Sequence, residues 1–409
     1  MEEEPNLDVL QDIHLHANND CSCCSIRDLI FCLIFSLIFF SVTYLPLLPY
    51  MDIPQFFAEW GAARFTGEVY HSQKVMHKDY AEMEKKFRIY VYPDDDDTNN
   101  TKNTIISGKY ASEDHFFRNI KESAFITRDP LQAHLFFIPI SCSKLHQKML
   151  SYKEMASIVG KYVERLIAMY PHWNRTLGAD HFFVTCHEID VRATRQVPFL
   201  VKNAIRVVCS PSYATGFIPH KDVSLPLVMQ PFAMPSSTTR NGISKRKILG
   251  YWAGTCNSET RTKLVNLWGQ DDELDIRCSK GFKNNGTKGV RMNKFYRFKF
   301  CICPVGKRAT TKRITMAIHY GCVPVIMSDY YDLPFNDILD WRKFSVILKE
   351  SDVYNLKDIL NAKAGEDYRK LYNHLLEVKK HFQWNRPVKY DTFGMVMYDL
   401  WLRRNVVKY

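Results

Sequence analysis

Residues 298–329 constrain the fold more than any other stretch of this chain, because two apolar runs in it flank a basic loop and a helical pattern. Residues 298–303 predict a short buried strand that stops at Pro304, and residues 323–327 predict a second one. Between them, the spacing predicts a helix of about a dozen residues that ends at Gly321. This order of strand, loop, helix and strand is typical of an α/β protein with a parallel sheet.

The loop of this unit suits a phosphate group. It contains Gly306, Lys307 and Arg308, and Arg313 follows in the predicted helix. Backbone N–H groups at a helix start are free, the helix dipole favours an anion there, and arginine makes forked contacts with phosphate oxygens. Any α/β protein has such a turn, however, and its basic side chains can simply be solvated. The residues alone leave a phosphate site and an ordinary turn both open.

Apolar strands alternate with helical patterns over most of the chain, which predicts mostly parallel sheets covered on both faces. A stretch rich in proline and small residues at 219–242 predicts a linker. We therefore expect an α/β fold with two domains, at 87–235 and 245–348, followed by C-terminal helices at 349–409. The predicted strands outside the first unit lie at residues 87–92, 133–139, 180–186, 206–209 and 248–254.

Residues 29–48 form one apolar run without a charge. At a rise of about 1.5 Å per residue, a helix of this length spans the roughly 30 Å hydrocarbon core of a bilayer. A cleaved signal peptide is disfavoured, since the run is too long and no Ala-x-Ala site follows it. The expected order is a cytosolic tail at 1–28, a transmembrane signal anchor at 29–48 and a stem at 49–86.

Cysteines and glycosylation motifs point to a secretory compartment. Eight cysteines follow the apolar run, and in an oxidising lumen some of them can pair, although the sequence does not give the connectivity. Their spacings fit no zinc site, so no metal is expected. Three Asn-x-Ser/Thr motifs, at Asn99, Asn174 and Asn285, suit glycosylation in the lumen.

The charge of the chain limits its partners. Its 409 residues carry a formal net charge of +11, which suits an anionic ligand such as a nucleotide sugar or an acidic polysaccharide. The chain has no basic arm, zinc finger or RNA-binding signature, so nucleic acid is not expected to be a partner.

The unit at 298–329 resembles the signature of the exostosin-like glycosyltransferases, glycosyltransferase family 47. That signature reads roughly Phe-Cys-Leu-Cys-Pro, Gly-x-Arg, Ser-x-Arg-Leu-x-(Glu/Asp)-Ala and Gly-Cys-Val-Pro-Val-Ile-x-Ser-Asp. Family-like stretches extend the resemblance over most of residues 87–348. Within the signature the matching residues are Cys301 to Pro304, Gly306, Arg308, Arg313, Ala317 and Gly321 to Ile326.

The resemblance implies a GT-B architecture, in which two Rossmann-like domains face a cleft. It also implies a Golgi type II membrane enzyme that transfers a sugar from a UDP-sugar to a plant cell-wall polysaccharide with inversion. The expected partners are the donor, the polysaccharide acceptor, the membrane and other glycosyltransferases in a complex. No cofactor is expected, because positive residues and a helix dipole replace the metal. The acidic run at 94–97 is accordingly expected to be a solvated loop rather than a metal site.

Two positions depart from the family pattern. Met316 stands where the family has an acid, and Leu227 stands where a family run continues with glutamate. The family acid can accept hydrogen bonds from the ribose hydroxyls, which methionine cannot do. Asp329, just past the second strand, is a candidate substitute. Together the two departures also allow another reading: a weak or inactive homologue that serves as a partner subunit or glycan-binding scaffold in a Golgi complex.

Candidate site residues follow from these requirements. The diphosphate needs positive charge, the acceptor hydroxyl needs a base, and the sugar must be held in line. Glu188 and His187 follow the strand at 180–186, where ligand groups gather in parallel sheets, and are the candidate bases. A structural histidine and a surface acid are the alternative there. Lys221 and Asp222 are candidates on the acceptor side. The candidates for the nucleotide sugar are Gly306, Lys307, Arg308, Arg313 and Asp329.

Overall fold

A computed structural model describes the chain from residue 69 to residue 405 with several gaps. The contacts group 67–409 into one compact unit, separate from 1–66. The predicted anchor at 29–48 lies outside the described residues, within which no helix is long and apolar enough to cross a membrane. For 188–190 only the backbone is described. The described residues are 69–93, 108, 111–141, 144–145, 148–186, 188–228, 242–279, 295–306, 312–385 and 388–405.

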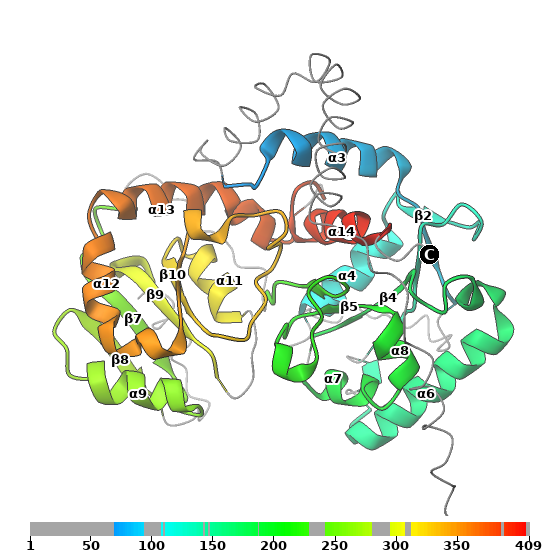
Figure 1. The fold of residues 1–409 in the computed structure, drawn as a ribbon, viewed down its shortest axis with the longest axis horizontal. Helices are drawn as coiled ribbons and strands as arrows, with labels where there is room; N and C mark the ends of the chain where they lie inside the picture. The colour runs from blue at the N-terminus through cyan, green and yellow to red at the C-terminus, as the bar shows by residue number, and fades with distance from the viewer. Residues whose placement is uncertain are drawn as a thin grey trace, which may run out of the picture. The chain divides into compact units, whose positions relative to one another are not determined.

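The first half of the compact unit is built on a six-stranded sheet in which all neighbouring strands run parallel (Figure 1). The strand order is β2-β1-β3-β4-β5-β6, so the chain crosses over helices between strands. The strands are β1 (Ile89–Val91), β2 (Ile126–Thr127), β3 (Leu135–Phe137), β4 (His181–Thr185), β5 (Ile205–Val208) and β6 (Val223–Ser224). The helices are α4 (Ala111–Lys121), α6 (Tyr152–Met169), α7 (Glu188–Thr194) and α8 (Pro198–Asn203).

Local sequence explains where these elements begin. Every residue of β4 is buried, as expected for an apolar strand covered on both faces. Helix α6 begins with a capping box, in which the Ser151 hydroxyl accepts from the Glu154 N–H and the Glu154 carboxylate accepts from the Ser151 N–H. One face of α6 then packs on the core through Met155, Val159 and Val163.

The second half is built on a five-stranded parallel sheet of order β11-β10-β9-β7-β8 (Figure 1). The predicted strand–loop–helix–strand unit is confirmed as β9, α11 and β10. Its helix ends in a Schellman turn at Gly321, whose φ of 65° favours glycine. The strands are β7 (Ile248–Gly254), β8 (Leu274–Cys278), β9 (Phe298–Pro304), β10 (Val323–Met327) and β11 (Val346–Leu348). The helices are α9 (Glu259–Trp268), α11 (Lys312–His319), α12 (Leu356–Lys363) and α13 (Glu366–Val378).

Two helices far apart in the sequence pack together, α3 (Gln73–Lys86) and α14 (Thr392–Arg403) (Figure 1). Helix α14 is buried on nearly all sides, which agrees with its mostly apolar sequence, and its buried charges Asp399 and Arg403 pair with one another. On α3, Met76, Tyr80 and Met83 are buried, and the Tyr80 ring contacts the ring of Tyr398. The described part of the predicted stem at 49–86 is therefore an integral part of the core, because its helix carries an apolar face that α14 covers.

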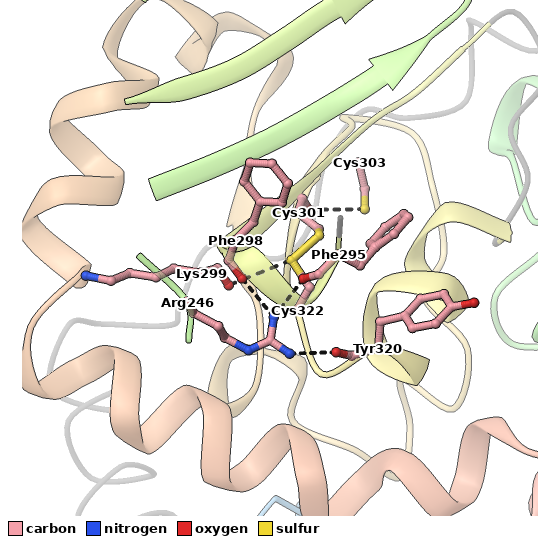
Figure 2. Close-up of a disulfide and its surroundings, with 8 residues drawn as sticks. All are labelled: Arg246, Phe295, Phe298, Lys299, Cys301, Cys303, Tyr320 and Cys322. Atoms are coloured by element: carbon pink, nitrogen blue, oxygen red, sulfur yellow. Dashed lines mark hydrogen bonds between the residues drawn. A yellow bond between two sulfur atoms is a disulfide. The ribbon is translucent and has the colours of Figure 1, made fainter. Parts of the chain in front are cut away.

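Three disulfides join neighbouring strands or the segments next to them: Cys186–Cys209, Cys256–Cys278 and Cys301–Cys322. Figure 2 shows the third, which ties β9 to the turn before β10. Cys303 is a buried free thiol, and burial raises its pKa to about 12. The pairing adds a covalent link between adjacent strands of both sheets.

Arg246 holds the amino end of β9 beside the same disulfide (Figure 2). Its buried guanidinium donates to the carbonyls of Phe295, Phe298 and Tyr320 at 2.9, 2.8 and 2.6 Å. One side chain thereby satisfies three backbone acceptors from the segment before β9, from β9 and from the end of α11. This contact fixes the amino end of β9, the strand that precedes the loop predicted to bind phosphate.

Candidate active site

The candidate site lies at the carboxyl ends of the strands of the second sheet. Pro304 ends β9 opposite Met327, which ends β10, and the Val305 N–H donates to the Met327 carbonyl at 3.0 Å. Gly254 ends β7, the other neighbour of β9. Because the strands are parallel, their carboxyl ends meet at one edge, which is where ligands bind in α/β sheets.

Arg261 lies at this edge, in the first turn of α9. The helix begins after Ser258, whose hydroxyl accepts from the Arg261 N–H. The guanidinium then folds back over the edge and donates to the Pro304 carbonyl at 3.1 and 3.3 Å and to Asn257 Oδ1 at 2.9 Å. Our sequence reasoning missed this residue. The glycine turn at Gly254, followed by a helix start with an arginine, was the signal that could have found it.

Gly306 fits against this guanidinium. A Cβ atom at residue 306 would lie 2.5 Å from the Arg261 Cζ, closer than atoms approach without a bond. Glycine at this position therefore lets Arg261 stack on the loop backbone. The predicted glycine of the phosphate loop is thus explained by a close approach rather than by an unusual φ angle.

Arg313 supplies a second guanidinium. It donates to the Ala253 carbonyl at 2.8 Å, and its Cζ lies 5.8 Å from the Trp252 ring, against 5.9 Å for that of Arg261. Burial, then repulsion from Arg313, lower the pKa of Arg261 to about 10, and burial lowers the pKa of Arg313. Both remain charged at neutral pH, and neither has a carboxylate partner within the described residues. The site therefore holds uncompensated positive charge, which favours an anion.

Two acids lie in the segments that follow β10 and β11. The carboxylate of Asp329, just past β10, accepts from the Glu350 N–H at 3.2 Å. Glu350 follows β11, and its own carboxylate accepts from the hydroxyl of Thr260, the neighbour of Arg261. The predicted residue Asp329 therefore lies at the same edge as the guanidinium groups, together with a second acid that the sequence reasoning did not consider.

Some predicted residues fall outside the description. Lys307 and Arg308 lie in the gap between β9 and α11, and His187 lies in the gap between β4 and α7. Glu188 is the first residue of α7, directly after the carboxyl end of β4, but its side chain is not described. The roles of these four residues stay predictions.

The two acceptor-side candidates are held inside the first half. Asp222 is fully buried and accepts from the N–H groups of Arg206 and Ile218 at 3.1 and 3.0 Å and from the Arg206 Nε at 3.0 Å. Lys221 donates to Asp222 and to the Ala204 carbonyl, both at 2.6 Å. These contacts close the connection between β5 and β6. They favour a structural role for Lys221 and Asp222, and an acceptor role stays untested.

Of the three predicted glycosylation positions, only Asn174 lies among the residues that the structure describes. Asn174 lies in the 3₁₀ helix Pro171–Arg175 and is exposed, which suits a modified asparagine. Asn99 and Asn285 lie outside the described residues.

The two departures from the family pattern meet in space. The Thr315 hydroxyl, one residue before Met316, donates to the Leu227 carbonyl at 2.7 Å. Leu227 is buried and Met316 is partly buried against the core. The segment with Leu227 is fixed from the other side by Ser112, which donates to the Pro226 carbonyl at 2.8 Å. Two expected acids are therefore replaced by two apolar residues that lie near one another.

Replacing Met316 by glutamate tests the ribose assignment. If this face of α11 meets the nucleotide, the new carboxylate accepts from two vicinal hydroxyls and tightens UDP binding by about 1–2 kcal/mol, less than a full charged hydrogen bond because it must first be desolvated. Titration calorimetry and a thermal melt on the same protein measure both effects, with Met316→Gln as the uncharged control. A lower melting temperature without tighter binding would remove Met316 from the site.

Comparison with known proteins agrees with this geometry. The two parallel sheets define an α/β protein and are consistent with the GT-B architecture. The arginines at the carboxyl ends of the strands of the second sheet suit an anionic ligand. Residues 83–363 match the Exostosin GT47 domain. A protein of Arabidopsis thaliana named a probable glycosyltransferase is 35% identical over 350 residues, which cover 84% of this chain and 67% of the relative. The chain belongs to the exostosin GT47 family of glycosyltransferases.

More distant relatives have more specific names. A protein of Arabidopsis thaliana named a probable glucuronoxylan glucuronosyltransferase is 26% identical over 344 residues, covering 77% of this chain and 72% of the relative. Among solved structures, a glycosyltransferase from Rickettsia africae aligns with 79% of this chain and 99% of its own at 10% identity, with a TM-score of 0.35. A likeness at that level says nothing specific about activity.

Proposed function

We propose that this protein transfers a sugar from a UDP-sugar to a plant cell-wall polysaccharide with inversion of configuration. The observation that carries the proposal is the pair of guanidinium groups of Arg261 and Arg313. Arg261 lies against Gly306, Arg313 lies against Gly254, and neither has a carboxylate partner in the described part of the chain. Family membership and relatives named for glucuronoxylan support the polysaccharide acceptor.

The chemistry needs a leaving group, a base and alignment. Arg261 and Arg313, with Lys307 and Arg308 from the adjoining loop, would balance the negative charge that grows on the diphosphate as the bond to the anomeric carbon breaks. The acceptor hydroxyl would attack that carbon from the opposite face and lose its proton to a base, for which Glu188 and His187 remain the candidates. Asp329, just past β10, remains the candidate to accept from the ribose hydroxyls in place of the acid that the family has at position 316.

A titration of the full chain with UDP tests this proposal against a second one. The apolar pair Leu227 and Met316 favours the alternative that the chain is a partner subunit or glycan-binding scaffold in a Golgi complex. If the chain is a transferase, it should bind UDP, the product released from the donor, with measurable affinity, because Arg261 and Arg313 can contact the diphosphate. Absence of UDP binding by a folded chain would favour the scaffold and contradict the enzyme.

We further propose that the protein is a single-pass type II membrane protein of the Golgi. The three disulfides suit an oxidising lumen, and the exposed Asn174 suits glycosylation there. The uncharged run at 29–48 is long enough to serve as the anchor.

Topology is tested with a tag at the carboxyl terminus. In intact microsomes the tag should resist added protease, and the chain should shift to a lower apparent mass after glycan removal. Detergent should restore cleavage, which controls for an intrinsically resistant tag. A tag that is cleaved in intact microsomes would place the globular part in the cytosol.

A further inference from the structure

A short antiparallel ladder joins the two halves of the compact unit. Ser212, after β5, forms a bridge with Tyr331, after β10. On either side of this bridge, the Tyr213 N–H donates to the Tyr330 carbonyl at 3.3 Å, and the Asp332 N–H donates to the Pro211 carbonyl at 2.9 Å. These two hydrogen bonds flank Ser212 and Tyr331, which therefore form a non-hydrogen-bonded pair of antiparallel strands.

The register of this ladder puts two tyrosines on one face. Residues next to a bridged pair lie opposite one another and point to the other side of the ladder. Tyr213 and Tyr330 are therefore cross-strand neighbours, and Asp332 shares their face. The Tyr213 hydroxyl donates to Asp332 Oδ1 at 3.3 Å, which agrees with this placement.

The face is open to solvent at its aromatic residues. The Tyr213 side chain is 40% exposed and the Tyr330 side chain is 67% exposed, whereas Ser212, on the other side, is buried. Exposed tyrosines are not unusual singly, but here backbone hydrogen bonds place two tyrosines opposite one another, and one of them is bonded to the carboxylate of Asp332. The backbone is thus held at both residues, and the Tyr213 ring is held further by Asp332 and by contact with the Phe217 ring.

The ladder adjoins the candidate donor site. Tyr330 directly follows Asp329, whose carboxylate accepts from the Glu350 N–H, and Glu350 in turn accepts from Thr260 beside Arg261. Tyr213 lies beyond the carboxyl end of β5, in the first sheet. The two tyrosines therefore follow strands of both sheets, and one of them is next in sequence to a candidate residue of the donor site.

We propose that Tyr213, Tyr330 and Asp332 form a subsite for a pyranose ring of the polysaccharide acceptor, an inference that rests on the proposed function. The apolar C–H face of a sugar ring packs on an aromatic ring, and its hydroxyls donate to a carboxylate. A platform of two rings accommodates neighbouring sugars of a chain, so the ligand class is an oligosaccharide rather than a free monosaccharide. In this proposal the acceptor binds at these three residues rather than at Lys221 and Asp222, because the buried contacts of Lys221 and Asp222 favour a structural role.

The test uses the full chain in detergent. An array of plant cell-wall oligosaccharides identifies the best-bound glycan, and calorimetry then measures its affinity and that of UDP for each variant. Tyr330→Ala should weaken glycan binding about tenfold, since it removes most of a ring's buried area, and Tyr213→Ala together with it should weaken binding further. Tyr152→Ala, on an exposed tyrosine of α6, is the matched control and should bind glycan normally.

The outcomes separate this subsite from the donor site. Weaker glycan binding with unchanged UDP affinity in Tyr330→Ala supports the subsite. No array binding by the wild-type chain, or equal glycan affinity in the double variant, overturns it even if UDP binds. Glycan binding through these tyrosines without any UDP binding would support the subsite while contradicting the proposed transferase.

Discussion

Replacing Arg261 by alanine is expected to weaken UDP binding by about 2–3 kcal/mol, which is roughly 30- to 150-fold in the dissociation constant. The Arg261 side chain brings a fork of N–H donors to the edge of the second sheet where the carboxyl ends of its strands meet. Its guanidinium lies against Gly306 and has no carboxylate partner within the described residues. A diphosphate would gain charge-assisted hydrogen bonds there that alanine cannot replace. Titration calorimetry on the purified full chain measures the change.

Two further variants make this result interpretable. Arg261→Lys keeps the charge but not the planar fork, and should lie between wild type and alanine. Lys263→Ala removes a cation from the same helix that instead pairs with Glu259 at 2.7 Å, and should leave UDP affinity unchanged. Because Arg261 also donates to the Pro304 carbonyl, each variant needs a thermal melt. A folded alanine variant with wild-type UDP affinity would show that Arg261 is not part of the donor site.

Replacing Asp222 by alanine is expected to lower the free energy of unfolding by about 3–5 kcal/mol, because it leaves two buried cations without their partner. Arg206 and Lys221 both donate to this carboxylate, and the side chain of Asp222 is fully buried. Chemical denaturation of the full chain measures the loss. Asp272→Ala, at an exposed aspartate, is the control and should change stability by no more than about 0.5 kcal/mol.

This experiment also decides what Asp222 does. A structural residue loses stability while the remaining folded protein binds glycan with normal affinity. A small loss of stability together with weaker glycan binding would instead return Asp222 to the acceptor site that the sequence suggested.

The sequence carries enough information to predict the second sheet around the phosphate loop. Apolar runs at 298–303 and 323–327 can only be buried in a sheet covered on both faces, and Gly321 is needed where α11 ends with a left-handed residue. The edge on which the site lies follows from parallel strand order. The structure has Gly306, Arg313 and Asp329 at this edge, and their role in binding a nucleotide sugar stays a prediction.

Other features depend on contacts that no local pattern reports. The Arg261 side chain reaches from α9 to the Pro304 carbonyl at the end of β9, so its place at the site depends on a tertiary contact. The ladder between Tyr213 and Tyr330 joins segments more than a hundred residues apart. The pairing of the cysteines, and the burial of α3 under α14, likewise follow from tertiary structure.

The most direct test of the central claim is sugar transfer by the full chain. The protein is incubated with a panel of UDP-sugars and cell-wall oligosaccharides, released UDP is quantified, and the anomeric configuration of the product is read by NMR. We expect acceptor-dependent UDP release from at least one donor, a product of inverted configuration, and loss of release in Arg261→Ala. Retained configuration would contradict the inverting mechanism, and a folded chain that neither binds nor releases UDP would contradict the transferase itself.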